Sequence, residues 1–228
     1  MLPALGAQRH SPAGRIRARD TVSDVAEIRQ QKAELRSRML AARAGLTADQ
    51  RVAAGRLIRD ALLSLPEVQM AGTVAAYYSV GAEPDTRGLV YALWKRGTYV
   101  LLPLLRPDGD LDWASYEGPD SLVPGPRGLR EPAEPPRGAD AVARADVVLA
   151  PALAVDRDGR RLGRGGGSFD RALARVGPLI PVIALLYDDE LVGRVPAEPH
   201  DVPVRSAVRP GHGITRLQAV PPDRSAPG

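Results

Sequence analysis

The chain has 228 residues, 44% of them hydrophobic and 25% charged, a composition typical of a soluble globular protein that buries a substantial core. The absence of cysteine excludes disulfides and cysteine-ligated metals, and with three histidines a zinc enzyme is disfavoured. The formal net charge of +4 resides in residues 1–19, which contain four arginines and no acid, so the remaining chain is neutral overall and does not favour a nucleic-acid partner.

We interpret residues 1–24 as a disordered basic leader. The segment lacks the apolar core of a secretory signal. Two other interpretations are upstream sequence included by a wrongly placed start codon and an arm that binds nucleic acid. No apolar run in the chain approaches the roughly 18 residues that a membrane span requires, so we expect a cytoplasmic protein without a membrane partner.

Apolar periodicity and turn residues predict helices that alternate with buried strands. In chain order we expect a helix over 25–44, a helix from Thr47 to Pro66, a strand over 73–80, a helix from Asp85 or Thr86 to Gly97, a strand over 98–105, an edge strand over 110–118, a Pro/Gly-rich loop over 118–138, a strand over 145–153, a helix near 170–176 and a strand over 178–187. Thr47 and Gln50 match the capping-box pattern at the start of the second helix.

This alternation of elements predicts the fold class. Nearly continuous apolar strands are typical of a parallel sheet that is covered on both faces. We therefore expect an α/β protein, a three-layer α/β/α sandwich with a largely parallel, Rossmann-like sheet, built as one domain over residues 25–215. Residues 216–228 are rich in proline and are expected to form a disordered tail.

Residues 157–173 read RDGRRLGRGGGSFDRAL and stand between a predicted strand and a predicted helix, where open α/β sheets bind ligands. Glycine N–H groups and a helix N-terminus attract anions, and the guanidinium groups of Arg161 and Arg164 suit phosphate oxygens. A carboxylate among such cations, here Asp170, suits Mg²⁺. The stretch predicts a polyphosphate site. The alternative is a flexible glycine loop with solvated arginines.

Three common motifs do not describe this stretch. It lacks the Gly-Lys-Ser/Thr of a Walker A loop, and Ser168 replaces the last glycine of the dinucleotide-binding fingerprint. Ser168 also lies outside any G-x-S-x-G nucleophile elbow.

Four blocks of the chain resemble the 5-formyltetrahydrofolate cyclo-ligase family, also called the 5,10-methenyltetrahydrofolate synthetases. RLGRGGGSFDRAL is similar to the family pattern R-L-G-R-G-x-G-[YF]-Y-D before a helix. The other blocks are KAELRSRML, YYSVGAEPDT followed by GTYVLLPLL, and VPAEPHDVPV. They occur in the family's order and span about residues 30–210.

The resemblance implies ATP-dependent cyclisation of 5-formyltetrahydrofolate to 5,10-methenyltetrahydrofolate, with release of ADP and phosphate. The formyl oxygen takes the γ-phosphoryl group, N10 attacks the activated carbon, and phosphate leaves as the ring closes. Mg²⁺ is the implied cofactor, with ATP as co-substrate and a reduced folate as the other small-molecule partner. We expect a monomer with no nucleic-acid partner. The alternatives are a catalytically weak paralogue that binds nucleotide or folate in a regulatory role, and a nucleic-acid-binding protein.

The resemblance also implies residue roles. The expected ATP-binding residues are Lys32, Arg36, Arg161, Leu162, Gly163, Arg164, Gly165, Gly166, Gly167, Ser168 and Phe169. Tyr78 and Glu83 fall at the pterin side, where a carboxylate accepts hydrogen bonds from pterin N–H donors. Arg164 and Asp170 are the expected catalytic residues, and Asp170 is the expected Mg²⁺ ligand.

Taken without the resemblance, several of these residues have plainer interpretations. Lys32 and Arg36 also suit a solvated helix face, and Glu83 suits a loop carboxylate beside a proline. Asp170 suits an acidic residue in a first helical turn, where it favours the helix dipole. His200 and Asp201 are expected to shape a C-terminal turn, without a chemical role.

The chain departs from the family pattern at three places. Gly166 replaces the usual lysine, so Arg164 must carry more of the phosphate charge. Ser168 and Phe169 stand where the family has two tyrosines, and Phe169 keeps an aromatic face for stacking. Arg205 replaces a second carboxylate offered to Mg²⁺, which weakens metal binding or places a cation against the phosphates.

Overall fold

The computed structural model describes residues 18–198 and 201–218. Its helices are α1 (Ala18–Ala44), α2 (Ala48–Leu63), α3 (Pro66–Gln69), α4 (Arg87–Lys95) and α5 (Ser168–Leu173), with short 3₁₀ helices η1 (Pro119–Ser121), η2 (Pro126–Gly128), η3 (Ala139–Arg144) and η4 (Asp188–Glu190). Its strands are β1 (Thr73–Ala75), β2 (Tyr99–Leu105), β3 (Leu111–Ser115), β4 (Leu122–Pro124), β5 (Arg130–Pro132), β6 (Val147–Pro151), β7 (Ala154–Val155), β8 (Arg161–Leu162), β9 (Val182–Leu185), β10 (Ser206–Arg209) and β11 (Gly213–Arg216).

A seven-stranded sheet in the order β11-β10-β9-β6-β1-β2-β3 forms the centre of the fold. The neighbours from β10 to β2 run parallel, whereas β3 and β11 pair antiparallel at the two edges. The predicted, largely parallel sheet with an edge strand after residue 110 is therefore confirmed.

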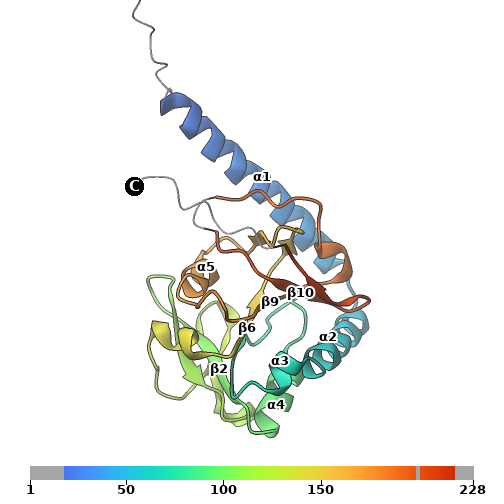
Figure 1. The fold of residues 1–228 in the computed structure, drawn as a ribbon, viewed down its shortest axis with the longest axis vertical. Coiled ribbons are helices and arrows are strands. Elements are labelled where there is room, and N and C mark those ends of the chain that lie inside the picture. Colours follow the sequence, from blue (N-terminus) through green and yellow to red (C-terminus); the bar gives the residue numbers. More distant parts are fainter. Residues whose placement is uncertain (1–17, 199–200, 219–228) are drawn as a thin grey trace, which may run out of the picture.

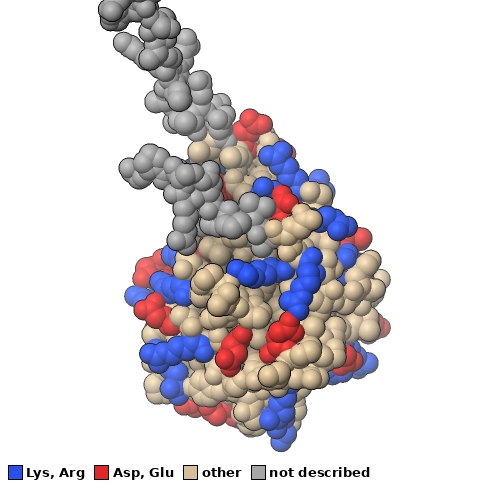
Figure 2. All heavy atoms as spheres, viewed as in Figure 1, with Lys and Arg blue, Asp and Glu red and all other residues tan. Residues whose placement is uncertain are grey.

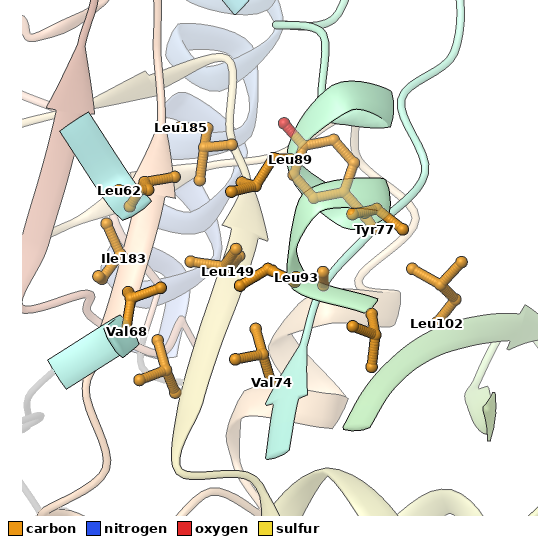
Figure 3. Close-up of a cluster of buried hydrophobic side chains, with 14 of the residues drawn as sticks. Leu62, Val68, Val74, Tyr77, Leu89, Leu93, Leu102, Leu149, Ile183 and Leu185 are labelled. Carbon is orange, nitrogen blue, oxygen red and sulfur yellow. The ribbon is translucent and has the colours of Figure 1, made fainter. Parts of the chain in front are cut away.

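Helices cover both faces of this sheet, because the buried strands carry apolar side chains in both directions. One face packs against α2, α3 and α4, and Figure 3 shows side chains from the sheet and these helices meeting there. The residues labelled on that face include Leu62, Val68, Val74, Leu89, Leu149 and Ile183. The other face packs against η3 and α5. The three-layer α/β/α sandwich is confirmed.

The winding of the sheet changes direction between β1 and β6. From β1 the chain crosses through α4 to β2 on one side, whereas β6 is followed by β9 and β10 on the other. Ligands in open α/β sheets bind at such a switch point, outside the carboxyl ends of the strands. The segments that follow β1 and β6, residues 76–86 and 152–168, flank this point.

Helix α1 packs on the body through its C-terminal half. Leu35 and Met39 contact Leu153 and the β7–β8 hairpin. The other end of the helix projects away from the sheet (Figure 1). The helix begins at Ala18, so the expected start at residue 25 was too late and residues 18–24 are helical. The remainder of the predicted leader lies outside the described residues.

The first strand is shorter than the predicted span of 73–80, because Thr86 competes for the backbone groups that would extend it. Thr86 Oγ1 donates to the Tyr77 carbonyl at 2.7 Å and accepts from the Ser79 N–H at 2.9 Å. These bonds turn the chain after Ala75. Thr86 is the N-cap of α4, but its side chain serves this turn and makes no capping bond to the helix.

Three sets of short strands were missed. The predicted loop over 118–138 contains the β4–β5 hairpin, the glycine stretch includes β8 of the β7–β8 hairpin, and β10 and β11 follow residue 205. These strands have two to four residues, too few to show a period of two. β11 reaches Arg216 and so enters the predicted tail, of which residues 219–228 are not described.

The capping box at the start of α2 is confirmed. The Gln50 N–H donates to Thr47 Oγ1 at 3.2 Å, and the Thr47 N–H donates to Gln50 Oε1 at 2.8 Å.

Surface charge is mixed on the face shown in Figure 2, where basic and acidic side chains are interspersed. Among the helices that the structure describes, none has the length and apolar character needed to cross a membrane.

Candidate active site

A cavity of about 350 Å³ lies at the switch point of the sheet. Its walls come from α1, from the loops after β1 and β6, from the ends of β2 and β3, and from the β4–β5 hairpin. The structure brings all of the predicted site residues to this one cavity: Lys32, Arg36, Tyr78, Glu83 and residues 161–170.

The glycine loop needs glycine at two of its positions. Gly165 and Gly167 have φ values of 104° and 67°, which lie in the region that L side chains rarely adopt. The Arg36 guanidinium lies against the loop, where its Nε donates to the Gly163 carbonyl at 3.0 Å. Helix α1 therefore supports the loop from one side.

Arg161 anchors the loop from beneath. Its side chain is buried and donates to Asp170 Oδ1 at 2.5 Å and to the Pro151 carbonyl at 3.1 Å. These bonds join the end of β6 to the first turn of α5. Asp170 is thereby fixed at the cavity wall, with one carboxylate oxygen already engaged by a cation.

Lys32 is 7% exposed, so the interpretation that places this residue on a solvated helix face is wrong. Its ammonium pairs with Glu198 at 2.9 Å and with Asp201 at 2.6 Å, and both carboxylates line the cavity. The predicted turn-shaping role of Asp201 is thus incomplete, and His200, for which the same role was predicted, lies outside the described residues. Glu198 was missed, since nothing in its sequence surroundings connects it with α1.

Glu83 lies between two sets of contacts. Its Oε2 accepts from the Val80 N–H at 3.0 Å, and its Oε1 lies 3.4 Å from the Nε of Arg164. Burial raises the pKa of Glu83 above its usual range, against the opposing effects of the Val80 N–H and of Arg164. The Glu83–Arg164 pair joins the loop after β1 to the loop after β6 across the cavity.

A buried ion pair lies beside this site and was missed. Arg43 donates from Nε to Glu190 Oε1 at 2.6 Å and from Nη2 to Glu190 Oε2 at 2.8 Å, and Nη2 also donates to the Ala152 carbonyl. Arg43 lines the cavity and is 2% exposed. The available signal was its spacing along α1, where Arg43 follows Met39 by four residues and Arg36 by seven and so lies on the same helix face.

The departures from the family pattern have visible consequences. Ser168 Oγ donates to the Gly109 carbonyl at 2.5 Å and so ties the loop to the β2–β3 turn. Phe169 meets Trp113 edge to face, with ring centroids 6.3 Å apart, so it packs toward the core as well as lining the cavity. Arg205 is exposed and is not among the residues that line the cavity.

In the described part of the chain, no three or more His, Cys, Asp or Glu side chains lie close enough together to hold a metal ion by themselves. Asp170 is the carboxylate of the glycine loop, and Glu83, Glu198 and Asp201 line the same cavity. Single carboxylates of this kind suit Mg²⁺, which keeps several water and phosphate ligands in polyphosphate sites.

Fold and site together define a class of protein: an α/β sandwich with a glycine-rich, basic loop at the switch point of its sheet. The sequence model of the 5-formyltetrahydrofolate cyclo-ligase family matches residues 28–210. The chain belongs to this family, and the resemblance noted in its sequence is confirmed.

Individual relatives agree with this assignment. The chain is 46% identical over 151 residues to the 5-formyltetrahydrofolate cyclo-ligase of Mycolicibacterium smegmatis, which covers 64% of this chain and 77% of that one. It is 34% identical over 175 residues to the enzyme of the same name from Escherichia coli K12, covering 74% and 94%.

Solved structures show the same fold. The NMR structure of Aquifex aeolicus 5,10-methenyltetrahydrofolate synthetase matches with a TM-score of 0.71 and 28% identity, over 86% of this chain and 96% of that one. The 5,10-methenyltetrahydrofolate synthetase of Mycoplasma pneumoniae matches with a TM-score of 0.61 at 20% identity, and this similarity shows the fold alone.

Proposed function

We propose that the protein is an ATP-dependent cyclo-ligase that converts 5-formyltetrahydrofolate into 5,10-methenyltetrahydrofolate and releases ADP and phosphate. The observation that carries this proposal is the single cavity in which the glycine loop faces Glu83, with 3.4 Å between Arg164 and Glu83, in a chain of this family. That arrangement holds a phosphate donor and a hydrogen-bonding heterocycle close enough to react.

The phosphate side of the site is formed by α1 and the glycine loop. Phosphoryl transfer depends mainly on positioning and charge neutralisation, so it needs donors and cations more than an acid–base pair. Backbone N–H groups of residues 163–167 and the guanidinium of Arg164 meet the phosphates, with Lys32 at the same wall. Arg36 and Arg161 keep the loop in place.

The folate side is formed by the loop after β1. The Glu83 carboxylate accepts hydrogen bonds from N–H donors of the pterin, and Tyr78 borders the same space. In the reaction, the formyl oxygen attacks the γ-phosphorus and ADP leaves. N10 then attacks the activated formyl carbon and loses its proton, and the carbon–oxygen bond breaks as phosphate departs with the former formyl oxygen.

Magnesium is proposed to enter with ATP. Asp170 would offer it one carboxylate oxygen, the remaining ligands being phosphate oxygens and water. When bound, the metal neutralises charge on the phosphoryl oxygens.

An isotope experiment tests this reaction sequence. With ¹⁸O in the formyl group of the substrate, the released inorganic phosphate should carry one ¹⁸O atom, detected by mass spectrometry. Unlabelled phosphate formed alongside the methenyl product would contradict attack by the formyl oxygen.

Glu83→Gln is expected to weaken folate binding roughly tenfold or more while leaving ATP affinity unchanged, since a hydrogen bond to a charged group contributes about 1.5–3 kcal/mol. The wild type should lose folate affinity as the pH falls through the raised pKa of Glu83, because only the ionised form is a full acceptor. The Gln variant should lack this pH dependence. Calorimetric titrations with each ligand check both points, and an equal loss for both ligands would assign Glu83 a structural role.

Gly166→Lys is expected to fold with unchanged stability and to lower the KM for ATP. A Cβ at this position would lie 3.6 Å from Ser168 Oγ, an ordinary contact, and Gly166 does not have a positive φ. Gly165→Lys is the matched control, because its φ of 104° imposes a strain of about 1–3 kcal/mol on a side chain. Thermal unfolding and initial rates compare the variants. Equal destabilisation of both would contradict this description of the loop.

We also propose that the protein acts as a cytoplasmic monomer on small molecules, without a nucleic-acid or membrane partner. The neutral charge of the chain beyond residue 19 supports the part of this proposal that concerns nucleic acid. Light scattering coupled to size-exclusion chromatography should give the chain mass of 24.3 kDa, whereas twice that mass would contradict the monomer.

A further inference from the structure

The β4–β5 hairpin is held firmly against the cavity. Glu131 Oε1 accepts from the Leu105 N–H, at the end of β2, with a distance of 2.8 Å. Gly125 packs so closely on the Glu131 carboxyl group that an added Cβ would lie 2.6 Å from its Cδ. The tip of the hairpin, residues 125–129, is therefore fixed at the cavity wall, to which Arg127 and Leu129 contribute.

Arg127, at this tip, has an unfavourable backbone conformation. Its φ and ψ are 56° and 27°, and it is the non-glycine residue with positive φ in the described part of the chain. Glycine adopts this conformation without cost, and the neighbouring Gly128 does so with φ of 77°. A residue other than glycine at such a position indicates a functional role for its side chain.

The guanidinium of Arg127 also differs from the other cations of the cavity. Within residues 18–198 and 201–218 it has no ion-pair or hydrogen-bond partner, and it is exposed. The other basic side chains at the wall all have partners: Lys32, Arg36, Arg43, Arg130, Arg161 and Arg164. Arg127 is thus the cation available to an incoming anion without breaking an existing contact.

The position of the hairpin indicates which anion. The phosphate cations come from α1 and from the loop after β6, whereas the hairpin is attached to β2, on the other side of β1. Apolar side chains line the cavity next to the hairpin: Pro103, Leu105, Leu111 and Leu129. A ligand that extends from Glu83 past this apolar wall places an aromatic ring on it and a terminal group at the hairpin tip.

We propose that Arg127 binds the carboxylates of the glutamate tail of the folate substrate. This inference rests on the proposed function. A reduced folate carries a pterin, a p-aminobenzoyl ring and a glutamate in that order, which matches the Glu83 loop, the apolar wall and Arg127. The forked donors of arginine suit a carboxylate, and an anion there compensates for the backbone strain.

The decisive variant is Arg127→Gly, which removes the guanidinium and relieves the positive φ. The KM for 5-formyltetrahydrofolate should rise about tenfold or more, the scale for a charge-assisted contact. The KM for 5-formyltetrahydropteroate, which lacks the glutamate, and the KM for ATP should stay unchanged. The melting temperature should stay equal or rise. Arg157→Ala, at an exposed arginine outside the cavity, is the control and should leave all these values unchanged.

Other outcomes overturn the assignment. An equal loss with both folates places Arg127 at the pterin, a higher KM for ATP alone places it at the phosphates, and a lower melting temperature with unchanged KM values makes it structural. If the wild type shows no turnover, the proposed function fails. Calorimetric titrations with the two folates then test Arg127, because Arg127→Gly should weaken binding of 5-formyltetrahydrofolate and leave binding of 5-formyltetrahydropteroate unchanged. A wild type that binds neither folate overturns both proposals.

Discussion

Arg164→Ala is expected to lower kcat about 100-fold or more, the loss seen when a preorganised charge stabiliser is removed from a transition state. Arg164 is the one large side chain between Gly163 and Gly167, and it reaches into the cavity toward Glu83. Since Gly166 stands where the family usually has lysine, we propose that the Arg164 guanidinium is the loop's cation for the transferring phosphoryl group.

The folded protein should tolerate this change. The Arg164 side chain is 52% exposed, and ion pairs with an exposed partner contribute about 0–1 kcal/mol. Arg171→Ala is the comparison, because Arg171 hydrogen-bonds to the Gly109 and Gly166 carbonyls and does not line the cavity. It should reduce kcat much less. Near-normal turnover in Arg164→Ala together with a large loss in Arg171→Ala would show that the phosphate lies elsewhere.

Arg43→Ala is expected to destabilise the fold by about 3–5 kcal/mol, because it leaves a buried carboxylate without its cation. Arg43 donates two hydrogen bonds to the Glu190 carboxylate, and both side chains are almost fully buried. The pair connects α1 to η4 and, through the Ala152 carbonyl, to the segment after β6. Urea unfolding followed by circular dichroism measures the loss.

Two further variants separate the ion pair from general effects of mutation. Arg59→Ala removes a surface pair with Asp60 and should change the unfolding free energy by less than about 1 kcal/mol. The double variant Arg43→Met with Glu190→Leu should be more stable than Arg43→Ala, since it leaves no unpaired buried charge. If Arg43→Ala is as mild as Arg59→Ala, the buried pair does not hold α1 to the body.

The layered fold was predictable because it depends on patterns that act locally. The apolar runs that became β2, β6 and β9 are continuous, as expected where helices cover both faces of a parallel sheet. The boundaries were less predictable. Strand β1 ends at Ala75 because Thr86, eleven residues later, forms hydrogen bonds with the backbone that follows the strand. No local sequence pattern predicts this contact.

The candidate site was predictable to the extent that its chemistry is concentrated in one stretch. Glycines beside arginines predicted an anion site in the loop over 161–170, and this loop lines the cavity. The partners of these residues were not predictable. Glu198 contacts Lys32 across 166 positions of sequence, and Glu190 contacts Arg43 across 147, so only the folded chain brings them together.

We propose that this cavity couples ATP cleavage to closure of the folate ring. The most direct measurement mixes the purified protein with 5-formyltetrahydrofolate, ATP and MgCl₂, and follows the absorbance of 5,10-methenyltetrahydrofolate together with released phosphate. The two products should appear in equal amounts, with none when ATP is omitted, and far more slowly with Arg164→Ala. Methenyl product formed without ATP, or none at high concentrations of folded protein, would contradict the claim.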